Sequence, residues 1–140
     1  MKVLQHIMLI TFFMFLSGCV STEETFSHNT PIVGVWTGVD EKGIEGSFIF
    51  NSDGSADVIN DGISIKDTVV RNRGTIKYHY DPSAIPSEFV LVIRNNNGKI
   101  KKIYGIVEFV SKDSIRINML PSGKRPVDFS GAIVLNRTNT

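Results

Sequence analysis

The clearest structural signal in this sequence is a seven-residue alternation, Ile44-Glu45-Gly46-Ser47-Phe48-Ile49-Phe50. In an extended chain Ile44, Gly46, Phe48 and Phe50 share one face, while Glu45 and Ser47 point to the other face. The next four residues, Asn51-Ser52-Asp53-Gly54, are of the types that favour a tight turn. The stretch therefore predicts a half-buried β-strand that ends in a turn.

The same pattern of short β-rich runs and turn residues continues through the rest of the chain. The expected strands cover residues 32–39, 44–50, 56–58, 63–69, 74–80, 89–93, 100–110, 114–119 and 131–137. We find no convincing amphipathic helix after the first 18 residues, and no long connection of the kind that parallel strands need. An antiparallel sheet with one wet face buries its other face by curling or closing. We therefore predict an all-β fold, an antiparallel up-and-down barrel of about eight or nine strands, with a β-sandwich as the alternative.

Residues 1–18 carry the features of a secretory signal peptide. Lys2 supplies the positive start, and residues 7–16 form an apolar run that is shorter than the roughly 20 residues of a membrane span. The run ends in Leu16-Ser17-Gly18-Cys19, which resembles the lipobox of bacterial lipoproteins. In that family the cysteine thiol is alkylated with diacylglycerol and the chain is cut just before it. An uncleaved anchor helix is the alternative.

The lipobox resemblance implies that Cys19 is the lipidation site and that acyl chains such as palmitate hold the mature protein on a membrane. Each buried CH₂ group contributes about 0.8 kcal/mol, so two or three chains give stable anchoring. Residues 19–31 are polar and lack periodicity, which predicts a flexible tether before a domain at residues 32–140. Val20 rather than Asp follows the cysteine, which by the same resemblance indicates the outer membrane, facing the periplasm.

The charge of the mature chain is balanced. Once Lys2 is removed with the signal peptide, 14 Lys and Arg residues stand against 14 Asp and Glu residues. There is no basic excess of the kind that nucleic-acid binding needs, so we predict no nucleic-acid partner. The only local basic cluster is Lys99, Lys101 and Lys102, which either solvates the start of a strand or contacts anionic lipid heads.

The mature chain lacks the residue patterns of an active site or a metal site. His28 falls in the tether and His79 on the wet face of a strand, and neither has a partner that the sequence can place. Asp53, Asp57 and Asp61 are not spaced as the ligands of a calcium loop are. We therefore predict that the protein is not an enzyme and has no catalytic residue, no metal and no cofactor.

One pair of motifs resembles the lipocalin signature. Gly34-Val35-Trp36 lies on the first expected strand and Arg137 on the last. In lipocalins a Gly-x-Trp places the indole across the floor of the barrel, and a late arginine packs over it. The resemblance implies a cation–π contact between Trp36 and Arg137, with Gly34 as the third member of the signature. A core tryptophan with an unrelated surface arginine is the alternative.

The second half of the chain is similar to a family of small bacterial lipocalin-like domains. The resemblance rests on Tyr80-Asp81-Pro82 with Pro86, on Ile103-Tyr104-Gly105-Ile106, and on the loop Ser122-Gly123-Lys124-Arg125-Pro126-Val127-Asp128-Phe129. It covers roughly residues 32–137, although Tyr104 precedes Gly105 where a Gly-Ile-Tyr order is expected. That family has no established activity, so the resemblance implies a fold rather than a function.

Two functions fit these observations. A barrel lined by aromatic side chains could hold a small hydrophobic ligand. The candidate ligand-binding residues are Trp36, Phe48, Phe50, Tyr78, Tyr80 and Phe109. The alternative is a non-enzymatic interaction or structural protein of the envelope with a filled barrel. Such a protein would bind a protein or cell-wall partner through the loops at residues 81–87 and 121–129.

Overall fold

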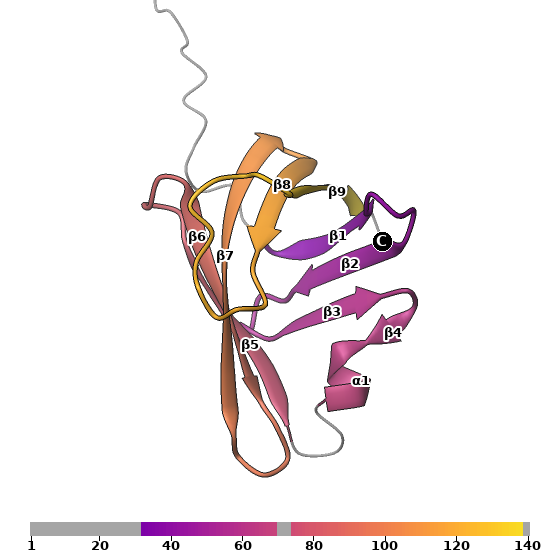
Figure 1. Cartoon of the computed structure of the whole chain (residues 1–140), viewed down its shortest axis with the longest axis vertical. Coiled ribbons are helices and arrows are strands. Elements are labelled where there is room, and N and C mark those ends of the chain that lie inside the picture. Colours follow the sequence, from indigo (N-terminus) through magenta and orange to yellow (C-terminus); the bar gives the residue numbers. More distant parts are fainter. Residues whose placement is uncertain (1–31, 70–73, 139–140) are drawn as a thin grey trace, which may run out of the picture.

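One antiparallel sheet of nine strands makes up most of the computed structural model, which describes residues 32–69 and 74–138 (Figure 1). A single short helix accompanies the sheet, so the predicted all-β fold is confirmed. The strands are β1 (Gly34–Val39), β2 (Glu45–Phe50), β3 (Ala56–Asn60), β4 (Ile63–Ser64), β5 (Thr75–Asp81), β6 (Ser87–Arg94), β7 (Ile100–Ser111), β8 (Ser114–Met119) and β9 (Ile133–Thr138), and the helix is α1 (Ile65–Val69).

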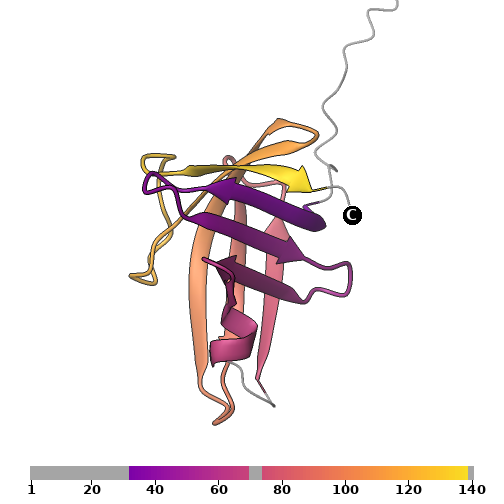
Figure 2. The same ribbon diagram turned by 90° about the vertical axis from the view of Figure 1, so that its right-hand side faces the viewer.

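The strands follow an up-and-down order that curls the sheet into a half-barrel. Their order across the sheet is β4-β3-β2-β1-β9-β8-β7-β6-β5, so nearly every strand lies beside its neighbours in the chain, and β9 pairs with β1. The long strands β5–β7 cross the direction of β1–β3 (Figure 2). The two ends of the sheet meet at a bridge between Ser55 and Lys77, where the Tyr78 N–H donates to the Gly54 carbonyl at 3.0 Å. One curled sheet therefore takes the place of the two sheets of a sandwich.

The inner face of the curled sheet forms the core, as the alternation predicted. In β2, Phe48 and Phe50 are 3% and 1% exposed. The β6 strand is apolar on both faces, yet only Phe89, Leu91 and Ile93 are buried. Burying a side chain of this size contributes about 1.5–3 kcal/mol. The core residues are Ile32, Trp36, Phe48, Phe50, Ala56, Val58, Ile76, Phe89, Leu91, Ile93, Val107, Ile115, Ile117 and Leu135.

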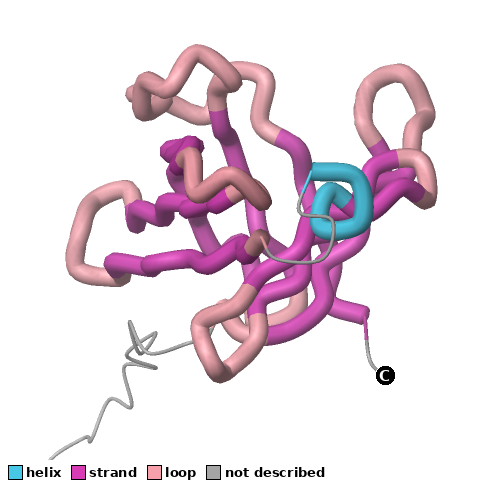
Figure 3. The backbone as a smooth tube through the Cα atoms, turned by 90° about the horizontal axis from the view of Figure 1, so that it is seen from below, coloured by secondary structure: helices cyan, strands magenta, loops and turns pink. Residues whose placement is uncertain are grey.

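The strand expected over residues 63–69 forms only at residues 63–64, as β4, and the prediction is wrong from residue 65, where the chain leaves the sheet and forms α1. The Ser64 Oγ accepts a hydrogen bond from the Asp67 N–H at 3.2 Å, and Ser64 itself donates to the Asp57 carboxylate at 2.6 Å. A serine followed three residues later by an acidic residue is a helix-start signal that competes with the β pattern. Ile65 then packs against the core. Figure 3 shows α1 as the cyan helix beside the strands.

No helix within residues 32–69 and 74–138 combines the length and apolarity that crossing a membrane requires.

The outer face of β6–β8 is covered by the connection between β8 and β9. Ile106 and Asn118 are register partners on this face, yet they are only 1% and 8% exposed. Asn118 follows the inward-facing Ile117 in β8, so its side chain points outward. It is buried because residues 120–132 pass over it and accept its hydrogen bonds. This part of the sheet therefore has protein on both sides.

A glycine on β7 makes room for an aromatic ring on β6. Gly105 is the register partner of Phe89, and a Cβ atom at Gly105 would overlap the Phe89 ring and lie 2.9 Å from the Asn118 carbonyl oxygen. An aromatic ring over a strand glycine is a known way to restore packing where the glycine has no side chain. The Phe89 side chain thereby reaches the Phe50 ring, with 6.2 Å between the ring centroids.

We predict that Gly105→Ala lowers the free energy of unfolding by about 1–3 kcal/mol, the usual cost of overpacking a core. Gly46→Ala is the matched control, since its Cβ would lie 3.5 Å from the nearest atom and should cost little. Urea denaturation of both variants measures the difference. Adding Phe89→Leu to Gly105→Ala should recover part of the loss, and equal stability of the two single variants would contradict this packing.

Candidate functional site

Three of the six aromatic residues predicted to bind a ligand are buried in the core. Trp36, Phe48 and Phe50 are 0%, 3% and 1% exposed. Their rings contact other rings of the sheet, with 4.9 Å between the centroids of Phe50 and Tyr78 and 5.9 Å between those of Trp36 and Phe109. Such edge-to-face pairs contribute about 0.5–1.5 kcal/mol beyond their buried area. These rings therefore fill the interior of the half-barrel.

The other three predicted residues, Tyr78, Tyr80 and Phe109, are half-buried at the margin of the core. The Tyr78 hydroxyl donates to the Asn51 carbonyl at 3.0 Å, so its polar end is already occupied. Burial raises the pKa of both Tyr78 and Tyr80, because the phenolate is poorly solvated there. The six residues thus come together, but as neighbours that pack on one another.

The structure also brings together the three residues of the lipocalin-type signature. The Arg137 guanidinium carbon lies 4.1 Å from the centroid of the Trp36 ring, in cation–π geometry. Arg137 Nη1 donates to the Val33 carbonyl at 2.7 Å, and Trp36 Nε1 donates to the Ile32 carbonyl at 2.7 Å. Gly34 has φ +141°, and a Cβ atom there would lie 2.6 Å from Arg137 Nη1. The positive φ favours glycine at this position, and a side chain there would also have to displace the Arg137 guanidinium.

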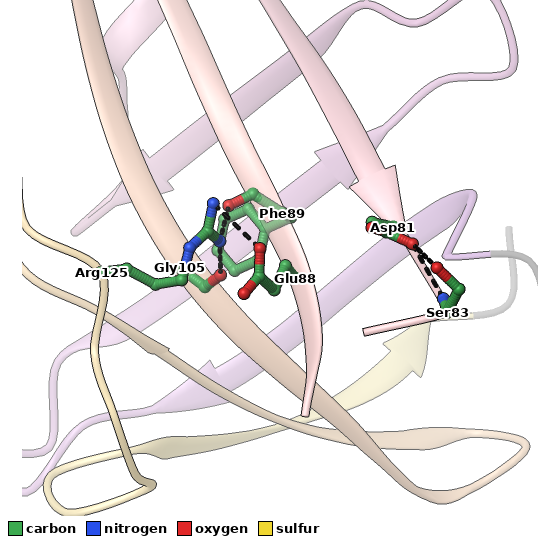
Figure 4. Close-up of polar contacts among 6 residues, drawn as sticks. All are labelled: Asp81, Ser83, Glu88, Phe89, Gly105 and Arg125. Carbon is green, nitrogen blue, oxygen red and sulfur yellow. Dashed lines mark hydrogen bonds and ion pairs between the residues drawn. The ribbon is translucent and has the colours of Figure 1, made fainter. Parts of the chain in front are cut away.

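Arg125 holds the β8–β9 loop against the outer face of the sheet (Figure 4). Its Nη1 donates to the carbonyls of Gly105 at 2.9 Å and of Phe89 at 3.3 Å, and its Nη2 lies 3.2 Å from the Glu88 carboxylate. Its guanidinium also lies 5.1 Å from the centre of the Tyr104 ring. Four contacts with β6 and β7 therefore fix one side chain of the loop.

The far end of the same loop is held by β8. Asn118 Nδ2 donates to the carbonyls of Asp128 at 2.9 Å and Ser130 at 3.0 Å. The Arg116 guanidinium lies 4.4 Å from the centre of the Phe129 ring and forms an ion pair with Glu108. Between Arg125 and these contacts Pro126 is buried, whereas Val127 and Asp128 are exposed. The second half of the loop is therefore held on both sides of a short exposed segment.

The loop between β5 and β6 is ordered by a carboxylate turn. The Asp81 Oδ1 accepts hydrogen bonds from the Ser83 hydroxyl and from the Ser83 N–H, the latter at 2.9 Å (Figure 4). These two bonds, followed by the positive charge of Arg125, hold the pKa of Asp81 below its ordinary value of 3.8. The loop leads into β6 at Ser87, and the next residue, Glu88, pairs with Arg125 of the β8–β9 loop.

Each of these two loops presents one large apolar side chain to solvent. Ile85 is 94% exposed and Val127 is 91% exposed, the highest values among the large hydrophobic residues of the described chain. Singly exposed apolar residues are common on protein surfaces. Here both lie on loops that polar contacts hold, those of Asp81 with Ser83 in one loop and those of Arg125 and Asn118 in the other. We call this pair of loops, residues 82–86 and 121–129, the double-loop surface.

The sequence identified both loops but not the residues that fix them. Glu88, Arg125 and Asn118 were not predicted to have a role in the site. Arg125 belongs to the loop Ser122 to Phe129, in the pattern Arg-Pro-x-x-Phe. That pattern is the one sequence signal that could have indicated a role for Arg125. Its two carbonyl partners lie 36 and 20 residues away in the chain, so no local pattern identifies them.

The remaining residues that the sequence singled out are a cysteine and two histidines. Cys19 and His28 lie outside the described residues. His79 is exposed on β5. Within residues 32–69 and 74–138, no three His, Cys, Asp or Glu side chains gather in a way that could hold a metal ion. No family model, curated protein or solved structure matches this chain.

We predict that Arg125→Met releases the β8–β9 loop and lowers the free energy of unfolding by about 2 kcal/mol. Hydrogen bonds from a charged donor contribute roughly 1.5–3 kcal/mol, and the half-exposed ion pair with Glu88 adds little. Hydrogen exchange should show faster exchange in residues 127–132. Arg125→Lys separates shape from charge, because lysine keeps the charge but lacks the planar fork. Full protection in Arg125→Lys would contradict the role of the two carbonyls.

We predict that Ser83→Ala raises the pKa of Asp81 towards 3.8 without fully reaching it, because the hydroxyl bond is lost and the Ser83 N–H bond remains. A carboxyl with a lowered pKa stabilises the folded loop above its unfolded pKa, and this stabilisation is lost as the pH falls through the folded value. Acid should therefore loosen residues 82–86 at a higher pH in the variant. NMR titration of the Asp81 carboxyl measures the shift, with Ser52→Ala as the control that leaves it unchanged.

Proposed function

We propose that this protein is a bacterial envelope lipoprotein, anchored by lipid on Cys19, whose half-barrel binds a protein partner through the double-loop surface without catalysing a reaction. The observation that carries the proposal is the pair Ile85 and Val127, each more than nine-tenths exposed on a loop that is held in place. Rigid apolar side chains at the centre of a polar surface are typical anchors of protein interfaces.

The fixed geometry of the loops supports this proposal on energetic grounds. Ordering a flexible loop on binding costs about 0.5–1.5 kcal/mol for each immobilised side chain. In the free protein the β8–β9 loop is already ordered by hydrogen bonds. Arg125 donates to the carbonyls of Phe89 and Gly105, and Asn118 donates to two carbonyls of the loop. A partner would therefore find the two anchors in place.

A carrier of hydrophobic ligands is the weaker proposal. Trp36, Phe48 and Phe50 are covered by neighbouring protein atoms, so a ligand could contact them only if the core rearranged. Tight packing makes such a rearrangement costly. Tyr78, Tyr80 and Phe109 retain some exposure, but at the margin of the sheet.

We predict that Ile85→Ser combined with Val127→Ser abolishes partner binding and leaves folding intact. Ile63→Ser combined with Val110→Ser is the matched control, since these residues are 58% and 59% exposed and lie away from the double-loop surface. A photo-reactive residue at position 84 in cells expressing the full chain should yield one adduct of defined mass. The double-loop variant should lose that adduct and the control should keep it.

Two results would contradict the proposal. The first is an adduct that survives the double-loop substitutions unchanged. The second is stoichiometric and displaceable binding of a fluorescent fatty acid to the purified full-length protein, which would favour the carrier instead.

A further inference from the structure

The charges of the described chain are divided between the two halves of the sheet. Residues 32–69, which form β1–β4 and α1, contain seven acidic and two basic side chains. Residues 74–111, which form β5–β7, contain five basic and three acidic side chains. Two of those three acids, Glu88 and Glu108, are paired with arginines of β8 and the β8–β9 loop. The balanced total therefore hides an acidic half and a basic half.

The basic side chains gather on the outer face of one end of β5–β7. Lys77 and Lys102 are both register partners of Val92, and Arg94 is the register partner of Ile100. The inner face at this level is occupied by Ile76 and Ile93, so these partners point the other way.

Lys99 is exposed in the adjoining β6–β7 turn. We call Lys77, Arg94, Lys99 and Lys102, with Val92 and Ile100 among them, the basic face.

The basic face offers exposed positive charge. In the part of the chain that the structure describes, only Lys77 of this face acts on a nearby carboxylate, that of Asp53. Within the described residues, none of its four cations forms an ion pair, and all four are exposed. Ile100, next to Lys99 in sequence, is 48% exposed. Surfaces that bind anionic membranes typically carry lysine and arginine around an exposed apolar residue. The cations contact the lipid headgroups, and the apolar residue enters the membrane interface.

We infer that the basic face docks on anionic lipid headgroups of the membrane that holds the protein, an inference that rests on the proposed lipid anchor. The acidic half is repelled from such a surface, so the charge division also sets an orientation. Because β6 runs from Ser87 to Arg94, the basic face lies at one end of this strand and the double-loop surface at the other. The docked protein therefore holds its partner-binding loops away from the membrane.

The chain between the anchor and the sheet is long enough to allow this orientation. Thirteen residue steps separate Cys19 from Ile32, and an extended chain spans at most about 43–47 Å over that number. The eight residues of β6 extend only about 26 Å at the usual rise of a strand. The basic end of the sheet can therefore reach the membrane from whichever end of the sheet the tether leaves.

The test uses the full-length protein purified from its own membranes, with Asn96→Cys in the β6–β7 turn carrying a fluorophore. The single natural cysteine is blocked if it is lipidated, and mass spectrometry of the N-terminal peptide checks this first. The protein is reconstituted in vesicles of phosphatidylcholine, or of equal parts phosphatidylcholine and phosphatidylglycerol, with a quencher on the headgroups. Since the anchor is present in both, quenching reports where the turn lies.

We expect strong quenching only in the anionic vesicles, and its loss at high salt, because the screening length falls from about 10 Å at 0.1 M to about 3 Å at 1 M. Each cation near an anionic surface changes the partition roughly fivefold. Arg94→Gln, Lys99→Gln and Lys102→Gln together should therefore reduce the docked population about a hundredfold. The control variant, Lys42→Gln with Lys66→Gln and Lys112→Gln, removes the same charge elsewhere and should keep the quenching.

Equal quenching in the two kinds of vesicle would overturn the inference. Loss of quenching in the control variant would also overturn it, because net charge rather than this face would then be responsible. A signal that changes only when purified cell-wall sacculi are added would assign the face to an anionic polymer instead. An unmodified Cys19 would refute the lipid anchor but not the docking of the basic face. In that case the docking is tested by co-sedimentation of the full chain with anionic vesicles, which should be sensitive to salt and lost in the basic-face variant.

Discussion

The packing of the Phe89 ring over Gly105 connects the inside of this sheet with its outside. On the inner face the ring extends the aromatic cluster around Phe50. On the outer face the carbonyls of the same two residues accept the hydrogen bonds of Arg125. A side chain at position 105 would displace the ring, and the β6–β7 backbone that Arg125 recognises would move with it. The core and the double-loop surface therefore depend on one cross-strand pair.

The interior and the surface of the half-barrel carry different parts of the functional argument. Inside, Trp36 and Phe50 are buried by protein atoms, and the Arg137 contact covers the Trp36 ring. A core filled in this way stabilises a scaffold but offers little to a ligand. Outside, Arg125 and Asn118 use hydrogen bonds to fix loops whose tips remain exposed. Recognition is therefore best sought on the surface.

The two proposed surfaces lie at opposite ends of β6 and differ in chemistry. The double-loop surface offers two apolar side chains on a rigid polar base, which suits a protein partner. The basic face offers exposed cations that form no ion pair within the described residues, which suits an anionic lipid surface. Charge attraction acts over a longer range than apolar contact. The basic face can therefore orient the protein, while the double-loop surface selects the partner that it binds.

The sequence by itself determined the strands and their inner face, because alternation with a period of two is a local property that residues such as Phe48 and Phe50 display directly. The strand pattern predicted the wrong element after Ser64, where a competing local signal is present. There the Ser64 Oγ accepts a hydrogen bond from the Asp67 N–H, and α1 starts in a run that alternates like a strand. Only the tertiary structure decided that Asn118 is buried and that Arg125 meets Phe89. Those contacts join residues far apart in the chain, and their geometry depends on how the curled sheet brings the β8–β9 loop back over its own outer face.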